Sequence, residues 1–327
     1  MKKYRVVLIL TILMMVLAGC GQKEGKADEK VVDNKDKLNV VVTIYPICDF
    51  TQKIAGDTVN ITQLIPLGSE PHDFEPSAET IKNIENADLL IVGGAGIDSW
   101  MEKVLGSISN KDLVLVDASY GIDLLDEHGS VIPANEYKHL LDFRSEGDGE
   151  NSVVADAHYW LDPLHSKVAV SNILEGLSKI NPDAKEEYTA NAEEVSNKLD
   201  SIDKDYREAL TPYAGRTMIV PHMAFGYLCH NYGIKQVGIK GFNSESEPSA
   251  KTMAEIVDTM KELNITTIFT EEVADKKVSE TLANEVGAKT EVLSPIETLT
   301  EDDVKNNEDY FTIMERNIKN IVGAFQN

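Results

Sequence analysis

Short β-branched runs alternate with helical stretches along most of this chain of 327 residues, and this alternation limits the fold more than any other feature. Residues 39–45 read NVVVTIY, a continuous apolar run of the kind buried on both faces of a parallel sheet. A helical stretch follows and stops at Gly56, before the next β-branched run. Strands that alternate with helices build βαβ units. The sequence therefore predicts an α/β protein with parallel sheets.

The alternation occurs twice, once in each half of the chain. We expect strands at residues 39–45, 59–66, 88–92, 113–116, 217–220, 235–239, 266–269 and 290–293. Further helices are expected at residues 77–85, 98–107, 223–232, 249–263, 275–286 and 301–325. The segments PSAETI (76–81) and PSAKTM (248–253) match at the same point of each half, where Ser77 can cap a helix. We interpret the halves as two copies of one plan, which predicts two α/β domains.

A long helix is expected between the halves, with Asn181 as its cap and Pro182 at its first position. One apolar stripe follows it at helical spacing: Tyr188, Ala192, Val195, Leu199, Ile202, Tyr206 and Leu210. About 28 residues at 1.5 Å each give roughly 42 Å. We therefore expect a spine along both domains, which divides the folded chain into a domain at 38–181, a linking helix at 182–211 and a domain at 212–327.

The N-terminus carries export signals. A basic start and an apolar stretch too short to span a bilayer indicate a signal peptide at residues 1–19. It ends in Leu17-Ala18-Gly19-Cys20, which resembles the bacterial lipobox and implies cleavage before Cys20 and acylation of that residue; the alternative is an ordinary signal peptide with a chance cysteine. Several acyl chains anchor a protein stably in a membrane. Residues 20–37 have the composition of a flexible tether.

Charge and cysteine content exclude other classes of protein. The 31 Lys and Arg residues against 55 Asp and Glu residues give a formal net charge of −24, which argues against nucleic-acid binding. Cys48 and Cys229 lie in apolar helical contexts, and we expect free thiols.

Residues 121–157 are acidic and contain several glycines, so we expect a long exposed loop with at most one short helix. His128 and His139 lie in this loop.

Three of the seven histidines lie where elements are expected to end. His72 and His222 follow strands, one in each half, and His158 precedes a helix. Ligands of open α/β sheets bind beyond the carboxyl ends of the strands. A cleft between the two domains would therefore bring these histidines together.

The segments around these histidines resemble those of the metal-binding solute-binding proteins of ABC importers, the cluster A-I or cluster 9 family. The strongest marks are the segment around His72, His-x-Trp-Leu-Asp-Pro at 158–163 and His-x-Ala-Phe-Gly-Tyr at 222–227. The resemblance covers the whole chain and implies that His72, His158 and His222 are metal ligands. It also implies a monomer that is anchored at the outer face of the bacterial cytoplasmic membrane, delivers metal to an ABC permease, and has a long helix that restricts hinge bending.

The resemblance leaves the fourth ligand open. Many relatives carry Asp in a Leu-Asp-Pro-Leu segment, but this chain has Ser294 there. In the branch that resembles Gram-positive zinc-uptake lipoproteins, a Glu three positions later takes the role, which corresponds to Glu297. The alternatives are Glu271, Glu272 and a water molecule.

The ligand types favour one metal. Three imidazoles and one carboxylate suit tetrahedral Zn²⁺, whereas manganese relatives replace one histidine by a carboxylate. Affinity alone would also admit Cu²⁺ or Ni²⁺. Imidazole must be neutral to bind metal, so we expect affinity to fall as the pH drops through about 6.5.

Four protein ligands leave no open position for an activated water, which favours carriage of zinc over catalysis. A secreted zinc hydrolase is a poor alternative because the chain contains no HExxH motif. The remaining alternatives are a manganese or iron importer of the same family and a surface adhesin. We expect a zinc-binding component of an ABC importer that is not an enzyme.

Overall fold

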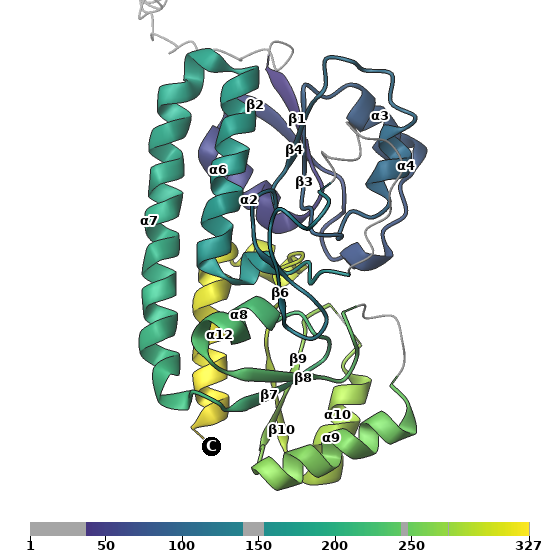
Figure 1. Cartoon of the computed structure of the whole chain (residues 1–327), viewed down its shortest axis with the longest axis vertical. Coiled ribbons are helices and arrows are strands. Elements are labelled where there is room, and N and C mark those ends of the chain that lie inside the picture. The colour runs from purple at the N-terminus through teal and green to yellow at the C-terminus, as the bar shows by residue number, and fades with distance from the viewer. Residues whose placement is uncertain (1–36, 140–153, 243–247, 274, 327) are drawn as a thin grey trace, which may run out of the picture. The chain divides into compact units, whose positions relative to one another are not determined.

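The computed structural model describes residues 37–139, 154–242, 248–273 and 275–326. Residues Lys37–Asn327 belong to one compact unit. Its strands form two four-stranded parallel sheets, and a long helix packs beside both (Figure 1). The expected α/β class is confirmed. The signal peptide, Cys20 and the tether lie outside the described residues, except for Lys37.

The two sheets have the same topology. The first has the order β2-β1-β3-β4 and the second the order β10-β9-β7-β8. Numbered within its own half, each sheet therefore has the order 2-1-3-4, which confirms two copies of one plan. The strands are β1 (Leu38–Val42), β2 (Val59–Gln63), β3 (Leu89–Val92), β4 (Val114–Asp117), β7 (Thr217–Val220), β8 (Lys235–Gly238), β9 (Thr267–Thr270) and β10 (Lys289–Val292).

Helices connect the strands in both halves. The first half has α2 (Tyr45–Ala55), α3 (Ala78–Glu85), α4 (Met101–Leu105) and α6 (Pro163–Ile180), and the second has α8 (Gly226–Tyr232), α9 (Ala250–Leu263), α10 (Lys277–Val286), α11 (Glu301–Lys305) and α12 (Tyr310–Phe325). Ser77 caps α3 by accepting from the backbone N–H of Thr80, and Ser249 caps α9 from Thr252 in the same way. The repeated sequence thus encodes the same helix start twice.

Alternate residues of the central strands enter different cores. In β1, Val40 and Val42 face the core formed with α2, α6 and α7, whereas Val41 faces α3 and α4. The first of these cores continues into the second half, where it includes Val220 and Phe269. One apolar core therefore joins the two sheets.

The long helix is α7 (Lys185–Leu210), and all seven residues of its expected apolar stripe are buried. It packs against α2 and α6 beside the first sheet and against α12 beside the second (Figure 1). Its start differs from the prediction, because a 3-10 turn (Pro182–Ala184) comes first and Ala184 is the N-cap. Asn181 does not cap α7; its side-chain amide donates to the Tyr188 hydroxyl at 2.9 Å.

Two further expectations were wrong in part. Residues 121–157 are not simply an exposed loop, since β5 (Leu124–Leu125) and β6 (Val131–Ile132) form a small antiparallel pair there. Leu124, Leu125 and Ile132 enter the core despite the surrounding acids, whereas Val131 is half exposed. Residues 140–153 lie outside the described part. The last expected helix is divided into α11 and α12, because Asp309 forms a new capping box with Thr312.

The described part of the chain contains no helix with the length and apolar character needed to cross a membrane. Within it, Cys48 and Cys229 are both free thiols, as expected. The remaining short elements are the 3-10 turns Pro71–Asp73, Tyr159–Leu161 and Thr211–Tyr213.

Candidate metal centre

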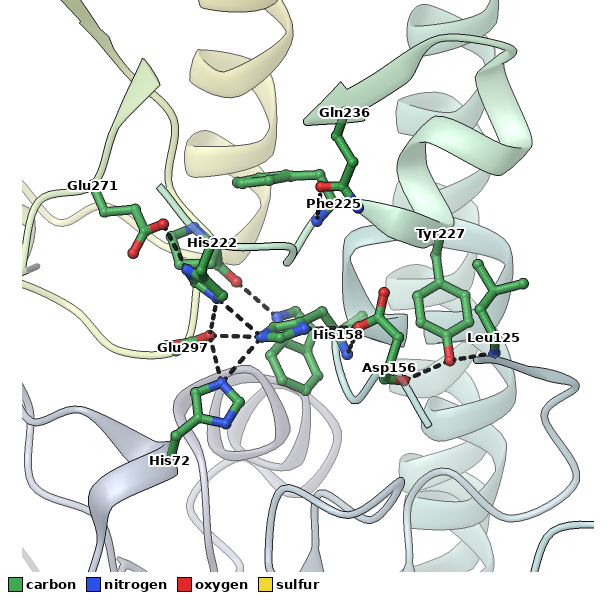
Figure 2. A network of polar contacts seen from close by, with 12 residues as sticks. His72, Leu125, Asp156, His158, His222, Phe225, Tyr227, Gln236, Glu271 and Glu297 are labelled. Carbon is green, nitrogen blue, oxygen red and sulfur yellow. Dashed lines mark hydrogen bonds and ion pairs between the residues drawn. The ribbon is translucent and has the colours of Figure 1, made fainter. Parts of the chain in front are cut away.

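Four side chains from both halves of the chain meet between the carboxyl ends of the two sheets (Figure 2). His72 lies in the 3-10 turn after β2, and His222 follows β7. His158 precedes the 3-10 turn that leads into α6, and Glu297 lies in the loop after β10. One atom from each lies within 4.8 Å of all the others. The structure thus brings together the three histidines and the acid that the sequence analysis selected.

The distances between the four candidate ligand atoms are those expected for atoms that surround a single metal ion. The Nε2 atom of His158 lies 3.2 Å from Nε2 of His72, 3.3 Å from Nε2 of His222 and 2.9 Å from Oε1 of Glu297. Oε1 of Glu297 is 3.4 Å from both other Nε2 atoms. A tetrahedron with metal–ligand bonds of about 2.0–2.1 Å has edges of about 3.3 Å. Five of the six separations among the four atoms therefore already approach those of a tetrahedral zinc shell, and the sixth is within 4.8 Å.

Two carboxylates fix the orientation of two of the rings. Oδ1 of Asp156 lies 2.8 Å from Nδ1 of His158, and Oε1 of Glu271 lies 2.7 Å from Nδ1 of His222. A proton on each Nδ1 leaves the lone pair of Nε2 facing the shared centre. Carboxylates in this position orient metal-binding imidazoles and increase their basicity.

The loop that carries Glu297 is held in a strained conformation. Ile296 is buried and has a φ of 56°, a left-handed backbone that costs a β-branched residue about 1–3 kcal/mol. Asn317 accepts from the backbone N–H of Ser294 at 3.0 Å and donates to its carbonyl at 2.7 Å. The Trp160 indole donates to the carbonyl of Pro295 at 2.8 Å. These contacts aim the Glu297 carboxylate at the three histidines.

The two rival acids have other partners. Glu271 contacts the outer nitrogen of His222, and Glu272 pairs with Arg316 at 2.7 Å. Neither belongs to the group of four. Their position after β9 made both acids candidate ligands in the sequence analysis. In the structure, their carboxylates contact His222 and Arg316 instead of the centre of the cluster.

The remaining histidines lie outside the group of four. His165 is partly exposed near Asp162, and His128 and His230 are exposed. His139 was expected in a solvated loop but is buried, with its Nδ1 atom 3.3 Å from the Ser119 hydroxyl oxygen. It packs against the rings of Tyr120 and Tyr137, and its Nδ1 atom lies 3.4 Å from an oxygen of the buried Asp117. These contacts within the fold explain the difference.

The charges of the cluster are strongly coupled. Burial alone would lower the pKa of His158, but hydrogen bonds with Asp156 and Glu297 outweigh it and raise the pKa to about 9. Burial opposes the charge of His222 as well, yet Glu271 and Glu297 raise its pKa. Burial would raise the pKa of Glu297, but hydrogen bonds from the three histidines lower it well below its ordinary value. Without metal, the cluster thus holds protons where a cation would bind.

Sequence reasoning missed the supporting residues. Asp156 stands two positions before His158, and this Asp-x-His spacing was a usable signal. Asn317 had none, because it lies 23 residues from Ser294 and on another element. The sequence could not distinguish whether Glu271 binds the metal or contacts a metal-binding histidine, because this depends on where its side chain points.

The chain is similar to known zinc-uptake proteins along most of its length. The family described as "zinc-uptake complex component A periplasmic" matches residues 40–324. The high-affinity zinc uptake system protein of Bacillus subtilis is 38% identical over 319 residues, which cover 97% of this chain and 96% of that protein. The zinc-binding lipoprotein AdcA of Streptococcus pneumoniae strain R6 is 35% identical over 98% of this chain, which spans only 60% of the AdcA length.

Solved structures show the same fold. The Zn(II)-bound ZnuA-like domain of Streptococcus pneumoniae AdcA has a TM-score of 0.72 and 35% identity, with coverage of 89% of this chain and all of that domain. The laminin-binding protein Lbp of Streptococcus pyogenes has a TM-score of 0.73 and 26% identity, with coverage of 88% and 99%.

Proposed function

Because the chain belongs to the family of zinc-uptake complex component A proteins, we propose that it is the zinc-capturing component of an ABC importer. It binds one Zn²⁺ through His72, His158, His222 and Glu297 outside the cytoplasm and passes the ion to a membrane permease. Zinc is the cargo of the protein.

The observation that carries this proposal is the convergence of three imidazole nitrogens and one carboxylate oxygen, with Nε2 of His158 and Oε1 of Glu297 lying 2.9–3.4 Å from each other and from the other two nitrogens. Two of the rings are held by carboxylates on their outer nitrogens. The ligands are preorganised before the cation binds, which lowers the entropic cost of ordering their side chains on binding.

Complete protein coordination suits capture rather than catalysis. A catalytic zinc keeps one position open for water or substrate, whereas four protein ligands complete a tetrahedral shell. The buried positions of His158, His222 and Glu297 keep bulk water from the ion. We therefore assign the chain a carrier role and no enzymatic one.

The donor set favours zinc over manganese. Imidazole suits Zn²⁺, while Mn²⁺ prefers oxygen ligands and higher coordination numbers. A manganese or iron importer would need a further carboxylate at the centre, but Glu271 and Glu272 are engaged with His222 and Arg316.

The anchor and the mode of release follow from sequence and packing. We assign a lipid anchor to Cys20 and a tether to residues 20–37, which would hold a monomer at the outer face of the cytoplasmic membrane. The core that joins both sheets and the packing of α7 along them oppose wide opening of the two domains, 38–181 and 212–327. Release would then use movement of the ligand loops.

Adhesion is a second candidate role, favoured by the fold similarity to the laminin-binding protein of Streptococcus pyogenes. Immobilised laminin would retain the purified protein if the similarity extends to binding. Absence of retention at micromolar protein concentrations would leave metal capture as the single role.

Elemental analysis of four purified proteins tests the zinc proposal. Wild type should hold one zinc per chain, and His222→Ala and Glu297→Ala should each weaken or lose it. His165→Ala is the matched control and should keep one zinc, because His165 lies outside the cluster. Manganese in place of zinc in the wild-type protein would contradict the metal assignment, and unchanged zinc in Glu297→Ala would remove Glu297 from the ligand set.

A further inference from the structure

Arg316 on α12 forms ion pairs with two acids near the metal centre. Its Nη2 atom lies 2.7 Å from Oε1 of Glu272, and its Nη1 atom lies 3.0 Å from Oδ1 of Asp303. The other oxygen of Asp303 accepts from the Thr300 hydroxyl at 2.7 Å and from the Thr300 backbone N–H at 3.0 Å, in the cap of α11. Arg316 is therefore held on one side by a fixed acid, and on the other side it holds Glu272 through a charge-assisted hydrogen bond.

Glu272 lies beside the candidate metal centre, although it is not one of the four proposed ligands. A small cavity of about 20 Å³ is lined by Glu272 and Glu297, together with Glu70, Glu271 and Ser294. A space of this size holds about one water molecule. The Glu272 side chain thus borders the same small space as the carboxylate of Glu297.

The other two acids that line this cavity have partners within the metal centre. The Oε1 atom of Glu271 lies 2.7 Å from Nδ1 of His222 (Figure 2). Glu70 accepts from the backbone N–H of His72 at 3.4 Å. Displacement of either acid would disturb a proposed ligand, whereas the ion-pair partner of Glu272 lies outside the ligand set. Glu272 is thus the acid that can turn toward the centre without loss of a contact to a ligand.

The number of oxygen ligands affects which metal a centre prefers. Zn²⁺ takes four ligands in a tetrahedron, whereas Mn²⁺ prefers more oxygen ligands. A second carboxylate beside that of Glu297 would raise the coordination number and favour Mn²⁺. We propose that Arg316 is a specificity-determining residue, whose guanidinium holds Glu272 out of the metal shell and so keeps the centre selective for Zn²⁺. This role of Arg316 rests on the proposed zinc role of the His72 group.

The ratio of zinc to manganese affinity separates this role from two simpler effects of Arg316. Its positive charge repels any divalent cation, so its removal would strengthen the binding of both metals. Its ion pairs also connect α11 to α12, and their loss would weaken the binding of both metals if it displaced the loop of Glu297. Neither effect changes the ratio, because both ions carry the same charge and use the same ligands. Release of Glu272 changes the ratio, because Mn²⁺ gains more than Zn²⁺ from an additional oxygen ligand.

Chelator competition with Zn²⁺ and Mn²⁺ tests the proposal on wild type, Arg316→Met, Arg316→Lys and the double variant Arg316→Met/Glu272→Gln. In Arg316→Met, the ratio of zinc to manganese affinity should fall by about tenfold or more, the scale of changes in groups that support a metal shell. The double variant should return to the wild-type ratio because it has no carboxylate to release. Arg316→Lys keeps the charge and should give a ratio closer to wild type than Arg316→Met does. Arg207→Met is the matched control, because Arg207 pairs with Asp203 on α7.

Co²⁺ reports the coordination number of the same centre. Tetrahedral Co²⁺ absorbs visible light strongly, whereas five- and six-coordinate Co²⁺ absorbs weakly. Wild type and Arg316→Met/Glu272→Gln should give the strong tetrahedral spectrum, and Arg316→Met should give the weak one. Arg316→Met/Asp303→Asn should behave like Arg316→Met, and it removes the unpaired charge of Asp303, which guards against misfolding of the single variant.

A wild-type affinity ratio and a tetrahedral Co²⁺ spectrum in Arg316→Met and in Arg316→Met/Asp303→Asn would overturn the specificity role of Arg316. A changed ratio that persists in Arg316→Met/Glu272→Gln would also overturn it, because another group would then have entered the shell. A wild-type protein that binds no zinc, or that binds manganese more tightly than zinc, would overturn the proposed function instead, which separates the two failures.

Discussion

Asp156 makes two hydrogen-bond contacts with His158 through the same oxygen. Oδ1 of Asp156 accepts from the backbone N–H of His158 at 2.9 Å and lies 2.8 Å from the Nδ1 atom of the His158 ring. Glu297 contacts the opposite nitrogen of the same ring at 2.9 Å. Figure 2 shows the imidazole between the two carboxylates. One acid thus orients the ring while the other shares the proposed metal, a division of roles that gives His158 a fixed direction before zinc arrives.

Asp156→Asn should weaken zinc binding about 10- to 100-fold, because the amide keeps the shape of the carboxylate but not the charge that supports His158. Isothermal titration with zinc in the presence of a competing chelator would measure the loss. Asp200→Asn is the control, since Asp200 lies on α7 in an exposed pair with Lys167. Equal affinities in Asp156→Asn and wild type would deny Asp156 its supporting role.

Asn317→Ala should weaken zinc binding by displacing the Glu297 loop, and should lower the free energy of unfolding by about 1–3 kcal/mol. The Asn317 side chain accepts from the backbone N–H of Ser294 and donates to its carbonyl, and these two hydrogen bonds hold Ser294 in the strained turn before Glu297. Asn320→Ala is the matched control, because Asn320 donates from the same helix to Val292 at 2.8 Å, before the turn begins. If both variants lost zinc affinity equally, the hydrogen bonds between Asn317 and Ser294 would have no specific role in positioning Glu297.

The metal-free and zinc-bound proteins should respond oppositely to pH. In the metal-free protein the pKa of His158 is raised from 6.5 to about 9, so its stabilisation is complete below pH 6.5 and disappears as the pH rises through 9. The lowered pKa of Glu297 adds stabilisation that is present above its ordinary pKa of 4.5. Melting temperature without metal should therefore be highest between pH 4.5 and 6.5 and fall toward pH 9.

Zinc must displace these protons, so its affinity should already decrease below pH 9 rather than only near 6.5, as the sequence alone predicted. Titration at pH 7.5 in buffers of different ionisation enthalpy should show proton release. A metal-free protein whose melting temperature increases from pH 6.5 to 9, or zinc binding without proton release, would contradict this account.

Leu199→Ala should lower the free energy of unfolding by about 2–5 kcal/mol and leave zinc affinity nearly unchanged. Leu199 is fully buried in the stripe of α7, far along the chain from every proposed ligand. Denaturant unfolding and zinc titration of the same samples would separate the two effects. Glu194→Ala, on the exposed face, should change stability by less than about 0.5 kcal/mol. A large loss of zinc affinity in Leu199→Ala would show that α7 packing sets the metal geometry.

Local sequence patterns predicted most of the fold. The β-branched runs located all eight strands of the two sheets, and the spacing from Tyr188 to Leu210 predicted the buried face of α7. These features depend on residues close in sequence. The break after Lys305 and the β5–β6 hairpin were missed because short acidic segments hide two-residue apolar signals.

The candidate site was only partly readable from the sequence. His72 and His222 stood at strand ends, and the resemblance to a family supplied His158 and Glu297. Contacts that support these residues depend on tertiary approach, as between Asn317 and Ser294 or between Trp160 and Pro295.

Anomalous diffraction at the zinc edge from crystals of the zinc-loaded protein tests the central claim most directly. The account predicts one strong peak within about 2.0–2.1 Å of Nε2 of His72, His158 and His222 and about 2.0–2.2 Å from an oxygen of Glu297. A peak bound by Glu271 or Glu272, or a water molecule in place of Glu297, would contradict it.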